Sequence, residues 1–167
     1  MMVKNKLVTK NWPLCSSALA VAILLCGAAQ SSIREKDLDQ DLQDLVKALE
    51  SIDYDVRFEE TPIPGKYGLT NAKKKTIWVA PITMEMGIFR KTLIHEAVHA
   101  VQSCPSGKFV PIGWELTVSP VIEQSIESNL YLNYPRKSHR IEKEAFLMQA
   151  QKKPVPMILE ALKTRCN

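Results

Sequence analysis

The chain has 167 residues, of which 22 are Lys or Arg and 18 are Asp or Glu, so its formal net charge at neutral pH is +4. Residues 1–29 hold three lysines and no acid, and the remainder has 22 − 3, or 19, basic residues against 18 acidic ones. This near-neutral remainder, without a Lys/Arg stripe interleaved with aromatic residues, argues against a nucleic-acid-binding protein.

The N-terminal segment, residues 1–29, has the pattern of a Sec-type signal peptide. Its three lysines precede an apolar run at residues 14–26, and small residues follow at 27–29. We expect cleavage after Ala29 and export to the periplasm or the medium, with no stable membrane association afterwards. An uncleaved membrane anchor stays open as the alternative. Residues 30–167 are then long enough for a single domain with its own core.

The first elements of this domain are predicted to be one helix followed by short strands. Apolar residues recur at helical spacing between residues 33 and 51. Residues 54–59, 67–70 and 76–80 favour extended structure and are separated by proline, glycine and asparagine, which predicts a small antiparallel sheet. A long helix at residues 84–103 is expected to follow the last of these strands.

This long helix carries the most informative motif of the chain, His95-Glu96-Ala97-Val98-His99. On a helix, the two histidines lie one turn apart on the same face, so both imidazoles can bind one metal ion. Neutral imidazole suits Zn²⁺, and a catalytic zinc site uses three protein ligands and keeps its fourth position for water. Glu96 is placed to take a proton from that water as the general base. The apolar neighbours of the motif predict a buried helix.

Residues 92–103 resemble the active-site helix of gluzincin-like zinc peptidases, which belong to the zincin superfamily of HExxH metallopeptidases. The metzincin pattern does not fit, because Gln102 and Pro105 stand where it has glycine and histidine. The resemblance implies a zincin-like α+β fold, mostly helical, with a small antiparallel sheet before the HExxH helix, and one bound zinc ion. It also implies that residues 76–80 form the rim of the substrate cleft with a free edge. Trp78 could line this groove, although a place in the core is the commoner role.

The third zinc ligand is expected on a helix predicted at residues 140–149, which looks like the glutamate helix of gluzincins. Several such families carry this ligand as Glu-x-x-Ala, which favours Glu142. Glu144, followed directly by Ala145, is the alternative ligand. Both glutamates could otherwise belong to a charged, exposed helix face.

Some gluzincins stabilise the tetrahedral oxyanion with a tyrosine or a histidine, which makes Tyr134 and His139 candidates here, with Tyr131 beside them. Each has an ordinary alternative role, because tyrosines at such places usually pack and a histidine in a first helical turn is usually solvated. His139 could also be a metal ligand, since it lies three residues before Glu142.

Cys104 and Cys166 are the two cysteines outside the N-terminal segment. In an oxidising compartment they suggest one disulfide between the end of the HExxH helix and a final helix at residues 155–165. Two unpaired thiols are the alternative. Thiolate binding of zinc is disfavoured, because neither cysteine has a partner at CxxC spacing. A loop at 107–117 and a helix at 120–132 complete the predicted elements.

The sequence therefore predicts an exported zinc metallopeptidase that acts on a peptide or protein substrate, with His95, His99 and Glu142 as metal ligands and Glu96 as the base. The alternative is a catalytically inactive zinc-binding module that recognises a peptide or protein partner.

Overall fold

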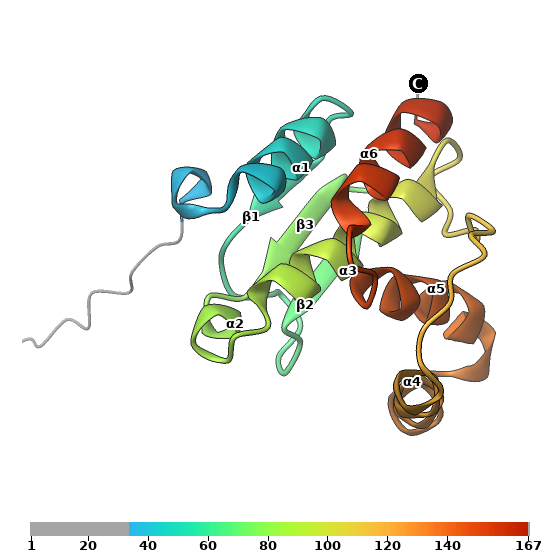
Figure 1. Ribbon diagram of the computed structural model, residues 1–167. Helices are drawn as coiled ribbons and strands as arrows, with labels where there is room; N and C mark the ends of the chain where they lie inside the picture. The colour runs from blue at the N-terminus through green and yellow to red at the C-terminus, as the bar shows by residue number, and fades with distance from the viewer. Residues whose placement is uncertain (1–33, 167) are drawn as a thin grey trace, which may run out of the picture. The chain divides into compact units, whose positions relative to one another are not determined.

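The computed structural model describes residues 34–166, which form helices and a three-stranded sheet (Figure 1). The predicted signal peptide and the start of the first predicted helix at Ile33 lie outside the described residues. Within residues 34–166, no helix is both long and apolar enough to cross a bilayer. The predicted α+β class is confirmed.

The sheet has the strand order β1–β3–β2 and is mixed. β1 (Asp55–Arg57) pairs in parallel with β3 (Thr76–Val79), whereas β2 (Gly68–Asn71) pairs antiparallel with β3. The prediction of an antiparallel sheet is therefore wrong for one of the two strand pairs. A tight turn joins β2 to β3 and reverses the chain, whereas a whole intervening strand separates β1 from β3 and lets the chain return in the same direction.

β3 is the central strand of this sheet, so the prediction that residues 76–80 form an open rim is wrong. Both of its edges are paired, and its four side chains are buried. Trp78 is only 8% exposed, and the guanidinium of Arg57 lies 6.0 Å from its ring centroid, so this side chain belongs to the core. The open edge next to the motif helix belongs to β2 instead.

The HExxH motif lies on α3 (Phe89–Ser103), which packs against β2, β3, α5 (His139–Gln149) and α6 (Pro154–Arg165). Buried side chains surround α3 on nearly all sides, as predicted for a helix with so many apolar residues. The helix is shorter than predicted. A short helix, α2 (Ile82–Glu85), precedes it, and Gly87 lies between them with a φ of +66°, a conformation that interrupts a helix and suits glycine.

α1 (Gln40–Glu50) and α3 lie across the same face of the sheet, and α6 packs against both helices (Figure 1). The predicted helix at 33–51 is divided into a 3-10 turn, η1 (Glu35–Asp37), and α1. The core fills the space between these layers. Its largest fully buried apolar side chains include Leu45, Leu49, Ile77, Leu93, Ile94, Met148 and Ile158.

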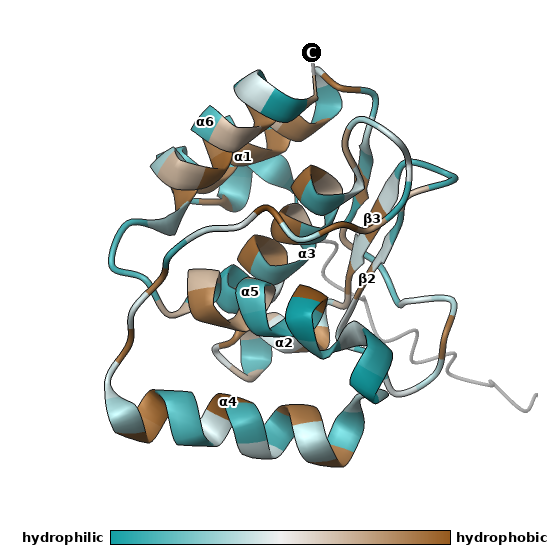
Figure 2. Cartoon of the chain, turned by 90° about the vertical axis from the view of Figure 1, so that its right-hand side faces the viewer, coloured by the Kyte–Doolittle hydropathy of each residue, from teal (hydrophilic) through white to brown (hydrophobic). Residues whose placement is uncertain are grey.

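α4 (Pro120–Asn133) lies on the outer side of α5, and Figure 2 shows apolar and polar residues alternating around it. Ser119 caps its N-terminus by accepting a hydrogen bond from the Ile122 amide, and Pro120 occupies the first helical position. The predicted helices at 120–132, 140–149 and 155–165 are confirmed to within one residue at each end. The predicted loop at 107–117 has no regular structure.

Candidate metal centre

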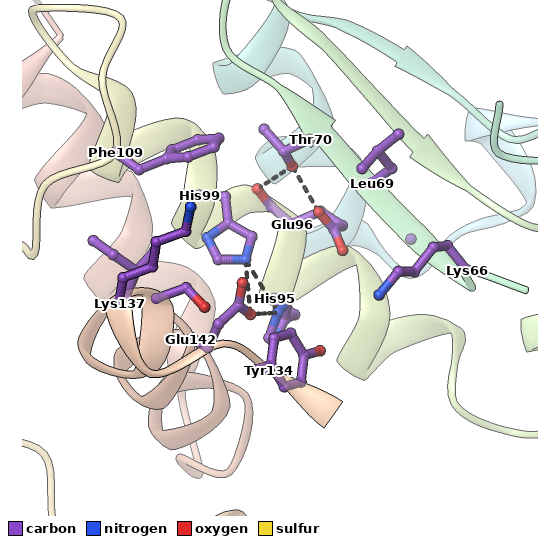
Figure 3. Close-up of a pocket in the computed structure, with 13 residues that line it drawn as sticks. Lys66, Leu69, Thr70, His95, Glu96, His99, Phe109, Tyr134, Lys137 and Glu142 are labelled. Atoms are coloured by element: carbon purple, nitrogen blue, oxygen red, sulfur yellow. Dashed lines mark hydrogen bonds and ion pairs between the residues drawn. The ribbon is translucent and has the colours of Figure 1, made fainter. Parts of the chain in front are cut away.

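A pocket of about 410 Å³ opens beside α3, between β2 and the start of α5 (Figure 3). Its α3 side is formed by His95, Glu96 and His99. β2 forms one wall, and the connection from α4 to α5 forms the facing wall together with the first residues of α5. The lining residues of these two walls include Gly68, Leu69 and Thr70 on the first and Tyr134, Lys137, Ser138, Ile141 and Glu142 on the second.

Three possible ligand atoms converge in this pocket. Nε2 of His95 lies 3.2 Å from Nε2 of His99 and 3.2 Å from Oε2 of Glu142. Nε2 of His99 lies 3.4 Å from the same carboxylate oxygen. The imidazoles are one turn apart on α3, and Glu142 reaches them from the first turn of α5, which packs along α3. These three residues could therefore hold one metal ion. Two imidazole nitrogens and one carboxylate oxygen are donors that suit Zn²⁺.

Glu142 and His99 stabilise each other's charged form. Burial alone would raise the pKa of Glu142, but hydrogen bonds from His95 and His99 outweigh it and lower that pKa to about 2. Burial alone would lower the pKa of His99, yet its hydrogen bond to Glu142 and the charges of Glu96 and Glu142 bring that pKa above the usual value. The ionised carboxylate therefore attracts a cation into the cluster, which is either a proton on imidazole or a metal ion.

The hydrogen bonds of Gln102 decide which nitrogen of His99 faces the cluster. The amide nitrogen of Gln102 donates to the carbonyl of Ile141 and to Oε2 of Glu144, both at 2.9 Å. Its oxygen must then accept from Nδ1 of His99, which lies 2.7 Å away. Neutral His99 carries its proton on Nδ1 in this arrangement, and the lone pair of Nε2 points at His95 and Glu142. This tautomer is the one that a metal ion in the cluster requires.

Glu144, the alternative third ligand, is engaged elsewhere. Besides Gln102, its two oxygens accept hydrogen bonds from the main-chain amides of Ile112, Gly113 and Trp114, at 2.8, 2.6 and 3.2 Å. Glu144 therefore fixes the loop after α3 to α5, and it is not part of the ligand cluster. The role of Gln102 was missed from the sequence, although its position three residues after His99 places both on one helix face.

Glu96 lies in the same pocket, and a residue of β2 fixes the position of its carboxylate. Its Oε2 accepts a hydrogen bond from the hydroxyl of Thr70 at 2.7 Å. β2 approaches α3 so closely here that a Cβ on Gly68 would lie 2.5 Å from Oε1 of Glu96 and 2.7 Å from Cγ2 of Thr92. Glycine at position 68 is thus required for this approach. No local pattern in the sequence marks Gly68 or Thr70, because their contact with α3 is made only in the fold.

The three oxyanion candidates differ in position. Tyr134 lines the pocket, and burial together with the nearby charges of Glu142 and Glu96 raises its pKa to about 12, so its phenol stays protonated. Tyr131 is 75% exposed on α4 and does not line the pocket. His139 is hydrogen-bonded through Nε2 to the carbonyl of Tyr134 at 2.9 Å and lies outside both the pocket lining and the ligand cluster.

The predicted disulfide between Cys104 and Cys166 is confirmed. The two residues are the C-caps of α3 and α6, and 62 positions separate them in the sequence. In the chain-entropy model, closing a loop of this length stabilises the fold by about 4 kcal/mol. The bridge thus fixes the C-terminal end of the helix that carries the three motif side chains.

Comparisons with known proteins give one match. A protein-family model described as a domain of unknown function (DUF8637) matches residues 63–166, well over half of the chain. The matched segment contains β2, β3 and every helix from α2 onward, including all residues of the pocket. No curated protein and no solved structure matches the chain significantly.

Proposed function

The chain belongs to the DUF8637 family, and from the geometry of its pocket we propose that it is an exported zinc-dependent metallopeptidase. The observation that carries this proposal is the convergence of the Nε2 atoms of His95 and His99 with Oε2 of Glu142, next to Glu96 in one pocket. A binding site for a structural metal needs no such neighbouring carboxylate, whereas hydrolysis needs a base.

His95, His99 and Glu142 would hold the zinc ion. When bound, the ion would supply Lewis-acid activation of a water molecule and of the substrate carbonyl. Gln102 holds His99 in the tautomer that leaves Nε2 available, and Phe146 packs against the ring of His95 with a centroid distance of 4.6 Å. These neighbours limit the rotation of both imidazoles, which keeps their nitrogens directed at one point.

Glu96 would move the proton during hydrolysis. Thr70 binds one of its oxygens, and the other, Oε1, is left to accept a proton from the attacking water. The water oxygen forms a bond to the carbonyl carbon of the substrate, the C–N bond breaks, and Glu96 passes the proton to the departing amine. Tyr134, neutral at all physiological pH values, would donate a hydrogen bond to the oxygen that becomes negatively charged.

The open edge of β2 would bind the substrate backbone. In the antiparallel pair, the amide of Ala80 donates to the carbonyl of Tyr67 at 2.8 Å, so residues 67, 69 and 71 face β3. The main-chain groups of the alternate residues, Gly68 and Thr70, therefore point away from β3 toward the open edge, and both residues line the pocket. An extended peptide could add there as a further strand.

Export is supported by two independent features. The first is the predicted signal peptide, and the second is the disulfide, because such bonds persist in oxidising compartments outside the cytosol. The proposed place of action is therefore the periplasm or the medium.

The test of this proposal compares the wild-type protein with Glu96→Gln. We expect both to bind one equivalent of zinc, measured by elemental analysis, while hydrolysis of a quenched-fluorescence peptide library falls about 10³-fold in the variant. Glu85→Gln on α2, outside the pocket, is the matched control and should keep full activity.

Two outcomes would contradict the proposal. A Glu96→Gln protein that hydrolyses peptides at the wild-type rate would remove the proposed base. A wild-type protein that binds zinc but cleaves no peptide would favour the catalytically inactive zinc-binding module.

A further inference from the structure

Two lysines line the proposed substrate pocket, and neither forms an ion pair with an acid within residues 34–166. Lys66 lies just before β2, and Lys137 lies in the 3-10 turn η2 (Arg136–Ser138) before α5. Lys143, further along α5 and outside the pocket, is by contrast paired with Glu123 and Glu127 on α4. The two pocket lysines thus keep their charges available to a ligand.

The acids of the pocket are already engaged. Glu142 contacts both histidines, and Glu96 accepts the hydroxyl of Thr70. The ammonium group of Lys66 lies 5.6 Å from the ring centroid of Tyr134, so within residues 34–166 its side chain contacts an aromatic ring and forms no ion pair with a carboxylate. Among the residues that the structure describes, no other acid lines the pocket.

The two lysines lie on opposite sides of the catalytic residues. Figure 3 shows Lys137 reaching past His99 toward Phe109, and Lys66 on the other side, next to Tyr134. A peptide bound along the open edge of β2 would advance by about 3.3 Å per residue. Residues on either side of its scissile bond would therefore come near one lysine or the other.

The charge of the pocket favours an anionic ligand. Two lysines balance Glu96 and Glu142, and a divalent metal ion adds two positive charges. A pocket with this positive balance attracts anions and repels cations. The positive balance of the pocket rests on the proposed function, because it includes the charge of the metal ion.

We infer that the substrate of this site is an acidic peptide, with carboxylates on both sides of the scissile bond, one facing Lys66 and one facing Lys137. The apolar lining residues Leu69, Phe109 and Ile141 add contact surface for the rest of the peptide. The shared chemistry is the carboxylate, which an internal Asp or Glu side chain or a free C-terminus could supply.

The test measures kcat/KM of the zinc-loaded protein on peptides with blocked ends that carry Glu, Gln or Lys on both sides of one cleavable bond. We expect the Glu peptide to be cleaved about tenfold faster than the Gln peptide, the Lys peptide to be the slowest, and the preference to shrink with added salt. A second Gln peptide with a free C-terminus separates recognition of a terminal carboxylate from that of side chains.

Variants of the lysines test the assignment directly. Lys66→Glu and Lys137→Glu should each lower kcat/KM for the Glu peptide about fivefold and raise it for the Lys peptide, whereas the Arg replacements should keep the wild-type preference. Lys47→Glu on α1 makes the same charge change away from the pocket and should leave the preference unaltered. Equal cleavage of the Glu and Gln peptides would overturn the inference and leave the peptidase proposal intact.

A binding measurement keeps the two proposals separate if no peptide is hydrolysed. Zinc-loaded Glu96→Gln protein is titrated with the same three peptides. Tighter binding of the Glu peptide, weakened by either lysine reversal, would support the acidic ligand even though the peptidase proposal had failed. Equal affinities for all three peptides would reject it.

Discussion

Nδ1 of His99 donates a hydrogen bond to Oε1 of Gln102 across 2.7 Å, one helical turn further along α3. Since both hydrogens of the Gln102 amide are used by Ile141 and Glu144, this oxygen has one orientation only. A buried amide thereby links the candidate metal cluster to α5 and, through Glu144, to the loop at residues 112–114.

Gln102→Leu should weaken zinc binding by about 10- to 100-fold, because His99 loses the acceptor that fixes its tautomer and ring orientation. The measurement is equilibrium competition with a chelator of known affinity. Gln124→Leu on the exposed side of α4 makes the same chemical change and should bind zinc as the wild type does. Unchanged zinc affinity in Gln102→Leu would show that His99 needs no such support.

Glu142 and Glu144 should respond differently to replacement by Gln. Glu142→Gln removes a ligand charge, so the protein should lose zinc at concentrations that saturate the wild type. Glu144→Gln should keep zinc and lower the free energy of unfolding by about 1–3 kcal/mol, because a charged acceptor of several main-chain amides is lost. Elemental analysis and urea unfolding monitored by circular dichroism distinguish the two. The reverse result would make Glu144 the ligand.

Gly68→Ala should impair hydrolysis without releasing zinc. The added methyl group would lie 2.5 Å from Oε1 of Glu96, so the carboxylate must move, and a displacement of about 1 Å can cost roughly 100-fold in rate. The readouts are kcat and zinc content on the same preparation.

Gly87→Ala is the control for this change, because nothing lies within 4 Å of its Cβ position and its φ of +66° strains any other residue. It should lower stability while keeping the wild-type kcat. If both alanine variants lost activity equally, stability and not the position of Glu96 would explain the effect.

The affinity for zinc should increase as the pH rises toward and past the raised pKa of His99, because the metal ion and a proton compete for that imidazole. Below this pKa, which lies above the ordinary value of 6.5, the apparent affinity should fall about tenfold per pH unit. Calorimetric titrations across the range from pH 5.5 to 8.5, about three units, would measure the slope. An affinity independent of pH over this range would contradict His99 as a ligand.

The stability of the metal-free protein should show the opposite dependence on pH above 6.5, the ordinary pKa of histidine. Because the folded pKa of His99 is raised, its stabilising contribution is complete below 6.5 and is lost as the pH rises through the folded value. Because the folded pKa of Glu142 is lowered, its contribution is complete above 4.5 and is lost as the pH falls toward about 2. The contribution of this pair to the unfolding midpoint of chelator-treated protein should therefore be largest between pH 4.5 and pH 6.5.

The sequence by itself determined those features of the site and the fold that depend on residues close together in the chain. His95, Glu96 and His99 are brought to one side of α3 by the helical repeat alone, and the helices at the C-terminal end were located by apolar periodicity and proline positions. The pairing of Cys104 with Cys166 followed because two cysteines allow one disulfide.

Only the tertiary structure decided which side chains meet those three. Glu142 and Glu144 are two residues apart on one helix, and the packing of α5 along α3 directs the first to the histidines and the second to Gln102 and the loop amides. The parallel pairing of β1 likewise made β3 central and left β2 as the edge beside Glu96. Such contacts join residues far apart in the chain, and their free energy depends on how whole elements pack, which no local pattern of residues encodes.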